Sequence, residues 1–175
     1  MQSPKKVVVL GPESTGKSTL CDQLAGHYHT RWVPEYARKY LTELGRPYNY
    51  DDLLTIARGQ VQSETDMLKN CHGQILFIDT DMYVMKVWCE FVFGKCHSYI
   101  LDQIVERDYD LYLLCNTDLP WTRDELREYP DPVNRNKLFR IYKDLMINQH
   151  TPWVEITGLD EERFRQGVHT VEELL

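Results

Sequence analysis

A glycine-rich stretch near the start of the chain limits the possible folds more than any other segment does. It reads Gly11-Pro12-Glu13-Ser14-Thr15-Gly16-Lys17-Ser18 and fits the pattern G-x-x-x-x-G-K-[ST]. An apolar run precedes it at residues 7–10, and an amphipathic helix pattern follows it at residues 19–28. A strand, a glycine loop and a helix in this order are the expected context of a phosphate-binding P-loop. The alternative, a plain glycine-rich turn before a helix, would match the four fixed positions only by coincidence.

The residue types of this loop suit a triphosphate. Its glycines can adopt backbone angles closed to other residues, so that successive N–H groups turn inward at a helix N-terminus and form an anion site. Lys17 is expected to reach the β- and γ-phosphates, and the Ser18 hydroxyl to ligate Mg²⁺. The sequence therefore predicts ATP and Mg²⁺ as ligands, and the predicted ATP-binding residues of the loop are Gly11, Glu13, Ser14, Thr15, Gly16, Lys17, Ser18 and Thr19.

Length and charge limit the remaining possibilities. The 175 residues suffice for one ordinary domain, so residues 1–175 are interpreted as a single unit. A net charge of −7 argues against broad binding to nucleic acid or to an anionic membrane, and no apolar run approaches the length of a membrane span. Five cysteines without C-x-x-C spacing indicate free thiols in a reducing cytoplasm. The oligomeric state is not predicted.

Five short apolar runs, at residues 7–10, 31–34, 74–78, 110–114 and 152–156, alternate with helical patterns. This alternation predicts an α/β fold of the P-loop NTPase type, with a doubly wound, five-stranded, mainly parallel sheet flanked by helices, as in nucleoside and nucleotide kinases. The helices are expected at residues 36–45, 51–70, 82–93, 134–149 and 160–174. Ligands of such sheets gather beyond the carboxyl ends of the strands, so the polar residues that follow each strand are the candidates for the site.

Two charged residues follow the second predicted strand. Glu35 stands at the end of the strand, where its carboxylate would face the γ-phosphate, and Arg38 follows one helical turn later. The alternative is a structural pair, in which the helix dipole favours the carboxylate and the arginine is its solvated partner. The P-loop upstream favours the functional interpretation.

The third predicted strand ends in Ile78-Asp79-Thr80-Asp81. Asp79 directly follows four apolar residues, which is the Walker B arrangement of a carboxylate that helps to hold Mg²⁺. Asp81 is interpreted as the N-cap of the next helix, as a hydrogen-bond acceptor for substrate hydroxyls, or as both. Trp88 lies off the apolar stripe of that helix, and it is either buried or stacked on a planar ligand ring.

A lid is predicted at about residues 117–135, where three prolines and alternating charges interrupt any long helix. Four arginines in and after this segment supply positive charge suited to phosphates, or are simply solvated: Arg123, Arg127, Arg135 and Arg140. After the last strand, Gly158 would allow a close approach to the adenine of ATP.

Five segments together resemble the ribosylnicotinamide kinase domain of NadR-type proteins, which belong to the P-loop, AAA-like ATP-binding proteins. They are the Gly11–Ser18 loop, Val33-Pro34-Glu35-Tyr36-Ala37-Arg38, Asp52-Leu53-Leu54-Thr55-Ile56-Ala57-Arg58-Gly59-Gln60, Asp79-Thr80-Asp81 and Lys86-Val87-Trp88. The likeness extends from residue 7 to about residue 174, and the combination is more specific than any one motif.

The resemblance implies transfer of the γ-phosphate of ATP to the 5′-hydroxyl of nicotinamide riboside, which gives nicotinamide mononucleotide in NAD salvage. It implies catalytic roles for Lys17, Glu35, Asp79 and Arg127, with Glu35 or Asp79 accepting the hydroxyl proton. It implies a Mg²⁺ site at Ser18 and Asp79, and ATP contacts at Arg123 and Gly158. The residues expected to contact the nucleoside are Glu35, Tyr36, Arg38, Asp81 and Trp88. Relatives often also carry an adenylyltransferase domain with an H-x-G-H motif and a DNA-binding segment. The sequence contains neither, so coupled dinucleotide synthesis and transcriptional control are not expected.

Two other functions remain open from the residues alone. One is a kinase for a deoxynucleoside or another small metabolite on the same scaffold. The other is a regulatory ATP-binding or ATPase module. A GTPase switch is disfavoured, because Cys115-Asn116-Thr117-Asp118 stands where a guanine-binding N-K-x-D motif would follow the fourth strand.

Overall fold

A central strand, β1 (Lys5–Leu10), organises a five-stranded sheet with the order β2-β3-β1-β4-β5. The computed structural model describes residues 3–175, and every strand pair in it is parallel. The other strands are β2 (Trp32–Val33), β3 (Ile75–Asp79), β4 (Leu111–Cys115) and β5 (Trp153–Ile156). The five predicted runs therefore form the sheet as expected, although β2 is shorter than the sequence indicated.

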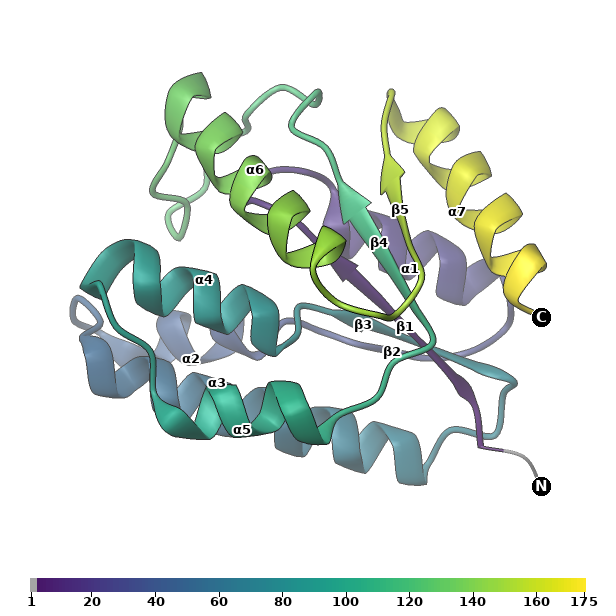
Figure 1. Cartoon of the computed structure of the whole chain (residues 1–175), viewed down its shortest axis with the longest axis horizontal. Helices are drawn as coiled ribbons and strands as arrows, with labels where there is room; N and C mark the ends of the chain where they lie inside the picture. Colours follow the sequence, from purple (N-terminus) through teal and green to yellow (C-terminus); the bar gives the residue numbers. More distant parts are fainter. Residues whose placement is uncertain (1–2) are drawn as a thin grey trace.

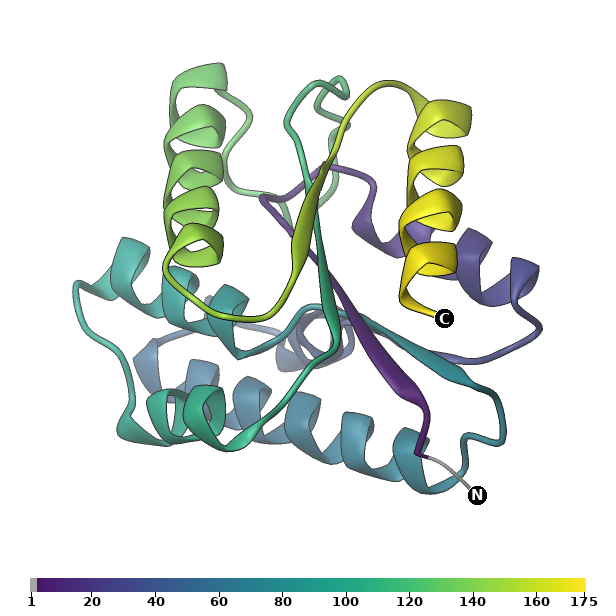
Figure 2. The same cartoon turned by 45° about the vertical axis from the view of Figure 1, so that its right-hand side comes forward.

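Helices cover both faces of the sheet (Figures 1 and 2). Val7 and Val9 of β1 pack against α1 (Lys17–His27) and α7 (Asp160–Leu174) on one face. Val8 and Leu10 pack against α4 (Met82–Phe93) and α6 (Pro132–Ile147) on the other. All four of these strand side chains have no exposed surface. A strand covered on both faces needs apolar residues at every position, which explains the continuous run in the sequence.

A second, smaller core lies beside the sheet. It joins α4 to α2 (Tyr36–Leu44), α3 (Tyr50–Lys69) and α5 (Ser98–Glu106), with Ala37, Leu53, Ile56, Met85 and Ile100 among its buried residues. The sequence did not reveal α5. This helix has nine residues, its N-cap side chain makes no capping hydrogen bond, and one of its residues is buried, so its pattern is weak.

The connection from β4 to α6 is shorter than the predicted lid of residues 117–135. Helix α6 begins at Pro132, two residues before its expected start, because the Asp131 carboxylate accepts a hydrogen bond from the Asn134 N–H at 2.8 Å. Proline suits the first position of a helix, where its missing N–H has no partner to lose. The segment of residues 116–131 is called the lid below.

The carboxyl ends of the strands meet at one edge of the sheet. The glycine-rich loop follows β1, Glu35 follows β2, Asp79 ends β3, and the lid follows β4. Parallel pairing brings these segments together although they are far apart in the sequence. Among the helices of residues 3–175, none has both the length and the apolar character that crossing a membrane requires.

Candidate active site

The glycine-rich loop has the backbone conformation that its sequence predicted. Gly11 and Gly16 have positive φ angles of 141° and 78°, and Gly16 is the N-cap of α1. A Cβ atom on Gly11 would lie 2.7 Å from the carbonyl oxygen of Cys115, so only glycine fits there. The Thr15 hydroxyl donates a hydrogen bond to the Pro12 carbonyl at 2.7 Å and braces the turn from inside. The loop therefore delivers its N–H groups to the start of a helix, where anions bind.

The Ser18 hydroxyl and the Asp79 carboxylate meet beside this helix start. Ser18 Oγ donates a hydrogen bond to Asp79 Oδ2, and Asp79 is fully buried at the end of β3. A hydroxyl and a carboxylate are the hard oxygen ligands that Mg²⁺ takes when phosphates and water supply the rest of its coordination. These two side chains, predicted as a metal site, therefore fit a Mg²⁺ ion that arrives with a nucleotide.

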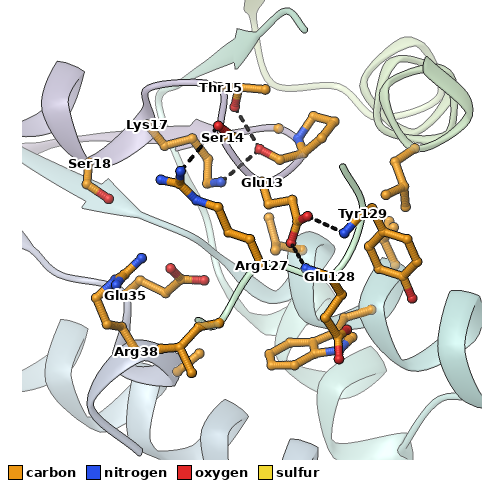
Figure 3. A pocket seen from close by; sticks show the side chains of 18 of the residues that line it. Glu13, Ser14, Thr15, Lys17, Ser18, Glu35, Arg38, Arg127, Glu128 and Tyr129 are labelled. Atoms are coloured by element: carbon orange, nitrogen blue, oxygen red, sulfur yellow. Dashed lines mark hydrogen bonds between the residues drawn. The ribbon is translucent and has the colours of Figure 1, made fainter. Parts of the chain in front are cut away.

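A cavity of about 220 Å³ opens beside the loop. Its polar end holds the glycine-rich loop together with Glu35 and Arg38, which lie in it as Figure 3 shows. Its other end is mainly apolar and aromatic, with contributions from α2, the α2–α3 connection, α4, α6 and the lid. The side chains of that end are Leu41, Tyr48, Val84, Val87, Trp88, Phe91, Val92, Leu126, Tyr129, Leu138 and Tyr142.

Glu35 is one of three carboxylate residues that line the cavity, with Glu13 and Glu128. It is the N-cap residue of α2, and its side chain makes no capping hydrogen bond. Burial raises the pKa of Glu35, the positive charge of Lys17 opposes this shift, and the charge of Asp79 adds to it. Burial likewise raises the pKa of Asp79. Lys17 itself donates a hydrogen bond to the Pro12 carbonyl at 3.0 Å.

Aromatic side chains form a connected wall at the other end of the cavity. The Trp88 indole N–H donates a hydrogen bond to the Tyr48 hydroxyl at 3.0 Å, and that hydroxyl donates to Glu128 Oε2 at 2.8 Å. Phe91 and Tyr129 meet edge to face with ring centroids 5.2 Å apart. Trp88 was the one member of this wall predicted as a ligand contact. Tyr48, Glu128 and Tyr129 were missed, because no local pattern indicates which loop residues fold over a cavity.

A second cavity of about 180 Å³ lies on the other side of the loop, and it shares Ser14, Gly16, Thr19 and Arg127 with the first. Arg163, which was also missed, lines it and joins three loops. Its guanidinium donates hydrogen bonds to the carbonyls of Thr15, Asn116 and Gly158 at 2.8 to 2.9 Å. The position of Arg163 on the buried side of α7 was a signal for such a role, since buried arginines need partners.

Arg127, predicted as catalytic, lies over the loop between the two cavities. Its Nη1 donates to the Ser14 hydroxyl at 3.3 Å and to the Thr122 carbonyl at 2.5 Å. Arg38 pairs with Asp124 of the lid at 3.1 Å. Both arginines are thus within the site that the sequence predicted for them.

Four predicted contact residues lie outside both cavities: Tyr36, Asp81, Arg123 and Gly158. The ring of Tyr36 packs on Gly59 of α3, and Arg123 is exposed. Asp81 is 2% exposed and caps α4, because its carboxylate accepts from the N–H groups of Tyr83 and Val84.

Gly158 directly precedes Leu159, the N-cap residue of α7, and lines neither cavity. Its φ angle is 84°, and a Cβ atom there would meet Glu162, whose carboxylate accepts from the Leu159 N–H at the start of α7. Its own N–H donates to the Asp118 carboxylate at 2.6 Å. The structure therefore explains this glycine by backbone geometry.

Comparison with known proteins gives consistent results. The sequence pattern of the family described as "AAA domain" matches residues 6–163. The trifunctional NAD biosynthesis/regulator protein NadR of Escherichia coli (strain K12) is 30% identical over 176 residues, which cover 98% of this chain and 43% of that protein. The chain thus spans less than half the length of this relative.

Solved structures resemble the whole chain. A NadR protein in complex with NR has a TM-score of 0.80 at 24% identity, covering 98% of this chain and 51% of the other. A NadR protein in complex with NAD and AMP-PNP has a TM-score of 0.76 at 23% identity, with 98% and 49% covered. Thymidylate kinase from Ehrlichia chaffeensis reaches 0.65 at 13% identity, with 99% and 100% covered. These likenesses confirm the fold of a P-loop kinase.

Proposed function

The chain belongs to the AAA domain family, and from this premise we propose that it is an ATP- and Mg²⁺-dependent kinase for nicotinamide riboside. The reaction would transfer the γ-phosphoryl group of ATP to the 5′-hydroxyl and give nicotinamide mononucleotide. The 30% identity to a NAD biosynthesis protein supports this proposal, as do related structures that hold NR or an ATP analogue. The main observation behind the proposal is a pair of cavities that share one P-loop, the first of which ends in an aromatic wall.

The donor would lie along the loop. Backbone N–H groups at the start of α1 and the Lys17 ammonium bind phosphates, and the second cavity takes the remainder of the nucleotide. Arg127, which lines both cavities, supplies positive charge between donor and acceptor. Ser18 and Asp79 would hold Mg²⁺, which when bound neutralises charge on the β- and γ-phosphates.

The acceptor would lie in the first cavity with its 5′-hydroxyl toward Glu35. The hydroxyl oxygen forms a bond to the γ-phosphorus while the bond from that phosphorus to the β–γ bridging oxygen breaks, and ADP leaves. The hydroxyl proton passes to Glu35, whose raised pKa makes it a better base near neutral pH than an ordinary carboxylate. Asp79 is the weaker candidate, because it is buried beneath Ser18 and does not line the cavity.

The aromatic wall favours nicotinamide riboside over an uncharged nucleoside. The pyridinium ring of this substrate carries a positive charge, which aromatic faces and carboxylates attract. Trp88, Tyr48 and Tyr129 offer the faces, and the Glu128 carboxylate, held by the Tyr48 hydroxyl, offers the negative charge. Trp88 is therefore proposed to stack on the ring.

Steady-state phosphorylation of nicotinamide riboside, thymidine and deoxycytidine with ATP and Mg²⁺ tests the proposal. We expect the highest kcat/KM for nicotinamide riboside, and ATP consumption that depends on an added acceptor because the closed site excludes water. Preference for a deoxynucleoside would replace the substrate assignment. ATP hydrolysis at the same rate with or without nucleosides would instead favour a regulatory ATPase.

The setting of this reaction is also a proposal. We place the protein in the cytoplasm, where ATP is abundant and its five free cysteines stay reduced. Its partners would be small molecules, in keeping with its net charge of −7, which disfavours nucleic acid.

A further inference from the structure

Glu13 stands within the P-loop, but its carboxylate binds the lid. It accepts hydrogen bonds from the backbone N–H groups of Glu128 at 2.9 Å and Tyr129 at 2.5 Å, as Figure 3 shows. The indole N–H of Trp121 approaches the same carboxylate at 3.4 Å. Its neighbour Ser14 accepts from the Thr122 N–H at 2.9 Å. Hydrogen bonds from N–H groups to an ionised carboxylate are about twice as strong as neutral ones.

The lid residues that Glu13 holds are those that complete the first cavity. Glu128 and Tyr129 line it, and each contacts a residue of the opposite wall. The Glu128 carboxylate accepts from the Tyr48 hydroxyl, and the Tyr129 ring meets Phe91. Fixing two adjacent N–H groups to one carboxylate therefore fixes two side chains at the aromatic end of the cavity.

A carboxylate in a phosphate-binding loop is unfavourable for the phosphates themselves, because like charges repel. In this loop the two oxygens of Glu13 point at lid N–H groups, while Lys17 and the helix start remain for the anion. The negative charge of Glu13, which would oppose phosphate binding, is thus directed at the N–H groups of the lid. This separates the function of Glu13 from that of the loop around it.

We propose that Glu13 is a positioning residue for the acceptor, and that it acts by holding the lid over the nucleoside cavity. The inference rests on the proposed kinase function only in taking the occupant of that cavity to be the phosphoryl acceptor. Loss of Glu13 then weakens binding of the acceptor and leaves binding of ATP nearly unchanged. A residue of the phosphate-binding loop would thus control the affinity for the acceptor.

Two variants, Glu13→Ala and Glu13→Gln, test this inference, and Glu125→Ala is the matched control because Glu125 is an exposed carboxylate of the same lid. The first measurement is amide hydrogen exchange across residues 119–131 without any substrate. We expect the amides of Glu128 and Tyr129 to exchange about tenfold faster or more in Glu13→Ala. Glu13→Gln keeps one acceptor oxygen and should lie between Glu13→Ala and the wild type, and the control should match the wild type.

The second measurement is the KM for each substrate. Glu13→Ala should raise the KM for the acceptor roughly 10- to 100-fold, as expected for hydrogen bonds to a charged group. Its KM for ATP should change by less than about threefold. An equal rise in the KM for ATP would assign Glu13 to the phosphates and overturn the inference, as would unchanged amide exchange. A wild type that phosphorylates none of the nucleosides would refute the proposed function, while the exchange measurement would still decide the role of Glu13.

Discussion

Replacement of Asp81 by asparagine should change how stability depends on pH. Complete burial raises the pKa of Asp81 to about 7, although the N–H groups of Val84 and Tyr83 and the Tyr112 hydroxyl, which bind its carboxylate, oppose the shift. The folded protein therefore holds a proton that the unfolded chain has released between pH 3.8 and about 7. Stability from this group is complete below pH 3.8 and is lost as pH rises to about 7.

The size of the effect follows from the shift. A change of about three pKa units corresponds to about 4 kcal/mol, because each unit is 1.36 kcal/mol. About 2 to 3 kcal/mol of this loss falls between pH 5 and pH 8. The asparagine side chain would not titrate, and asparagine is as good an N-cap as aspartate, so helix α4 keeps its start. The amide NH₂ of the new side chain can donate to the Tyr112 hydroxyl.

The assay is urea unfolding of the wild type and Asp81→Asn at pH 5 and pH 8. We expect the variant to gain about 2 to 3 kcal/mol relative to the wild type over this interval. Asp131→Asn is the matched control, because Asp131 is an exposed N-cap of α6 and its hydrogen bond from the Asn134 N–H lowers its pKa. Stability from a lowered pKa is lost only as pH falls below the range tested, so the control difference should stay flat.

Asp81→Asn should also keep a kcat/KM near that of the wild type, because Asp81 does not line the cavity. A stability difference between Asp81→Asn and the wild type that does not change from pH 5 to pH 8 would refute the burial argument. A large loss of turnover with normal stability would restore the alternative that Asp81 binds substrate hydroxyls.

Four further substitutions test other parts of the structure. Lys17→Ala should lower kcat by at least roughly 10²-fold with an unchanged circular dichroism spectrum, and near-wild-type turnover in the folded variant would rule out the phosphate assignment. Glu35→Gln should lower kcat by roughly 10²- to 10⁴-fold. It should also remove the fall in rate toward acid pH, which burial of Glu35 should place above the ordinary carboxyl pKa of 4.5; an unchanged pH–rate profile would contradict its role as the base. Gly59→Ala should destabilise the protein by roughly 1 to 3 kcal/mol, since its Cβ would lie 2.2 Å from a tyrosine ring of α2. Gly26→Ala, with open space around it, should stabilise helix α1 by about 0.5 to 1 kcal/mol, and equal unfolding free energies for the two glycine variants would contradict the packing argument.

Local sequence patterns predicted the helices with a clear periodicity and the strands with a continuous apolar run. Helices α4 and α7 have the bounds that their periodicity indicated, and the apolar run of β1 lies at the buried centre of the sheet. Helix α5 was missed because it buries little of its surface, and the start of α6 was misplaced because Pro132 was interpreted as an interruption. Proline ends a helix when it lies inside it and begins one when it lies at its first position.

Local sequence patterns were sufficient to predict the P-loop, the parallel sheet and the carboxylates where its strands end. Each of these depends on neighbours in the chain: glycine spacing, continuous apolar runs, and an acidic residue where a strand ends. Tertiary structure alone decided how the aromatic end of the cavity is closed. Glu13 meets its lid partners across 108 to 116 residues, and no local signal reports a contact at that distance. Folding of the lid onto the loop also places the backbone N–H groups of Glu128 and Tyr129 against the Glu13 carboxylate. Asp81, by contrast, caps α4 through the N–H groups of Tyr83 and Val84, its near neighbours in the chain.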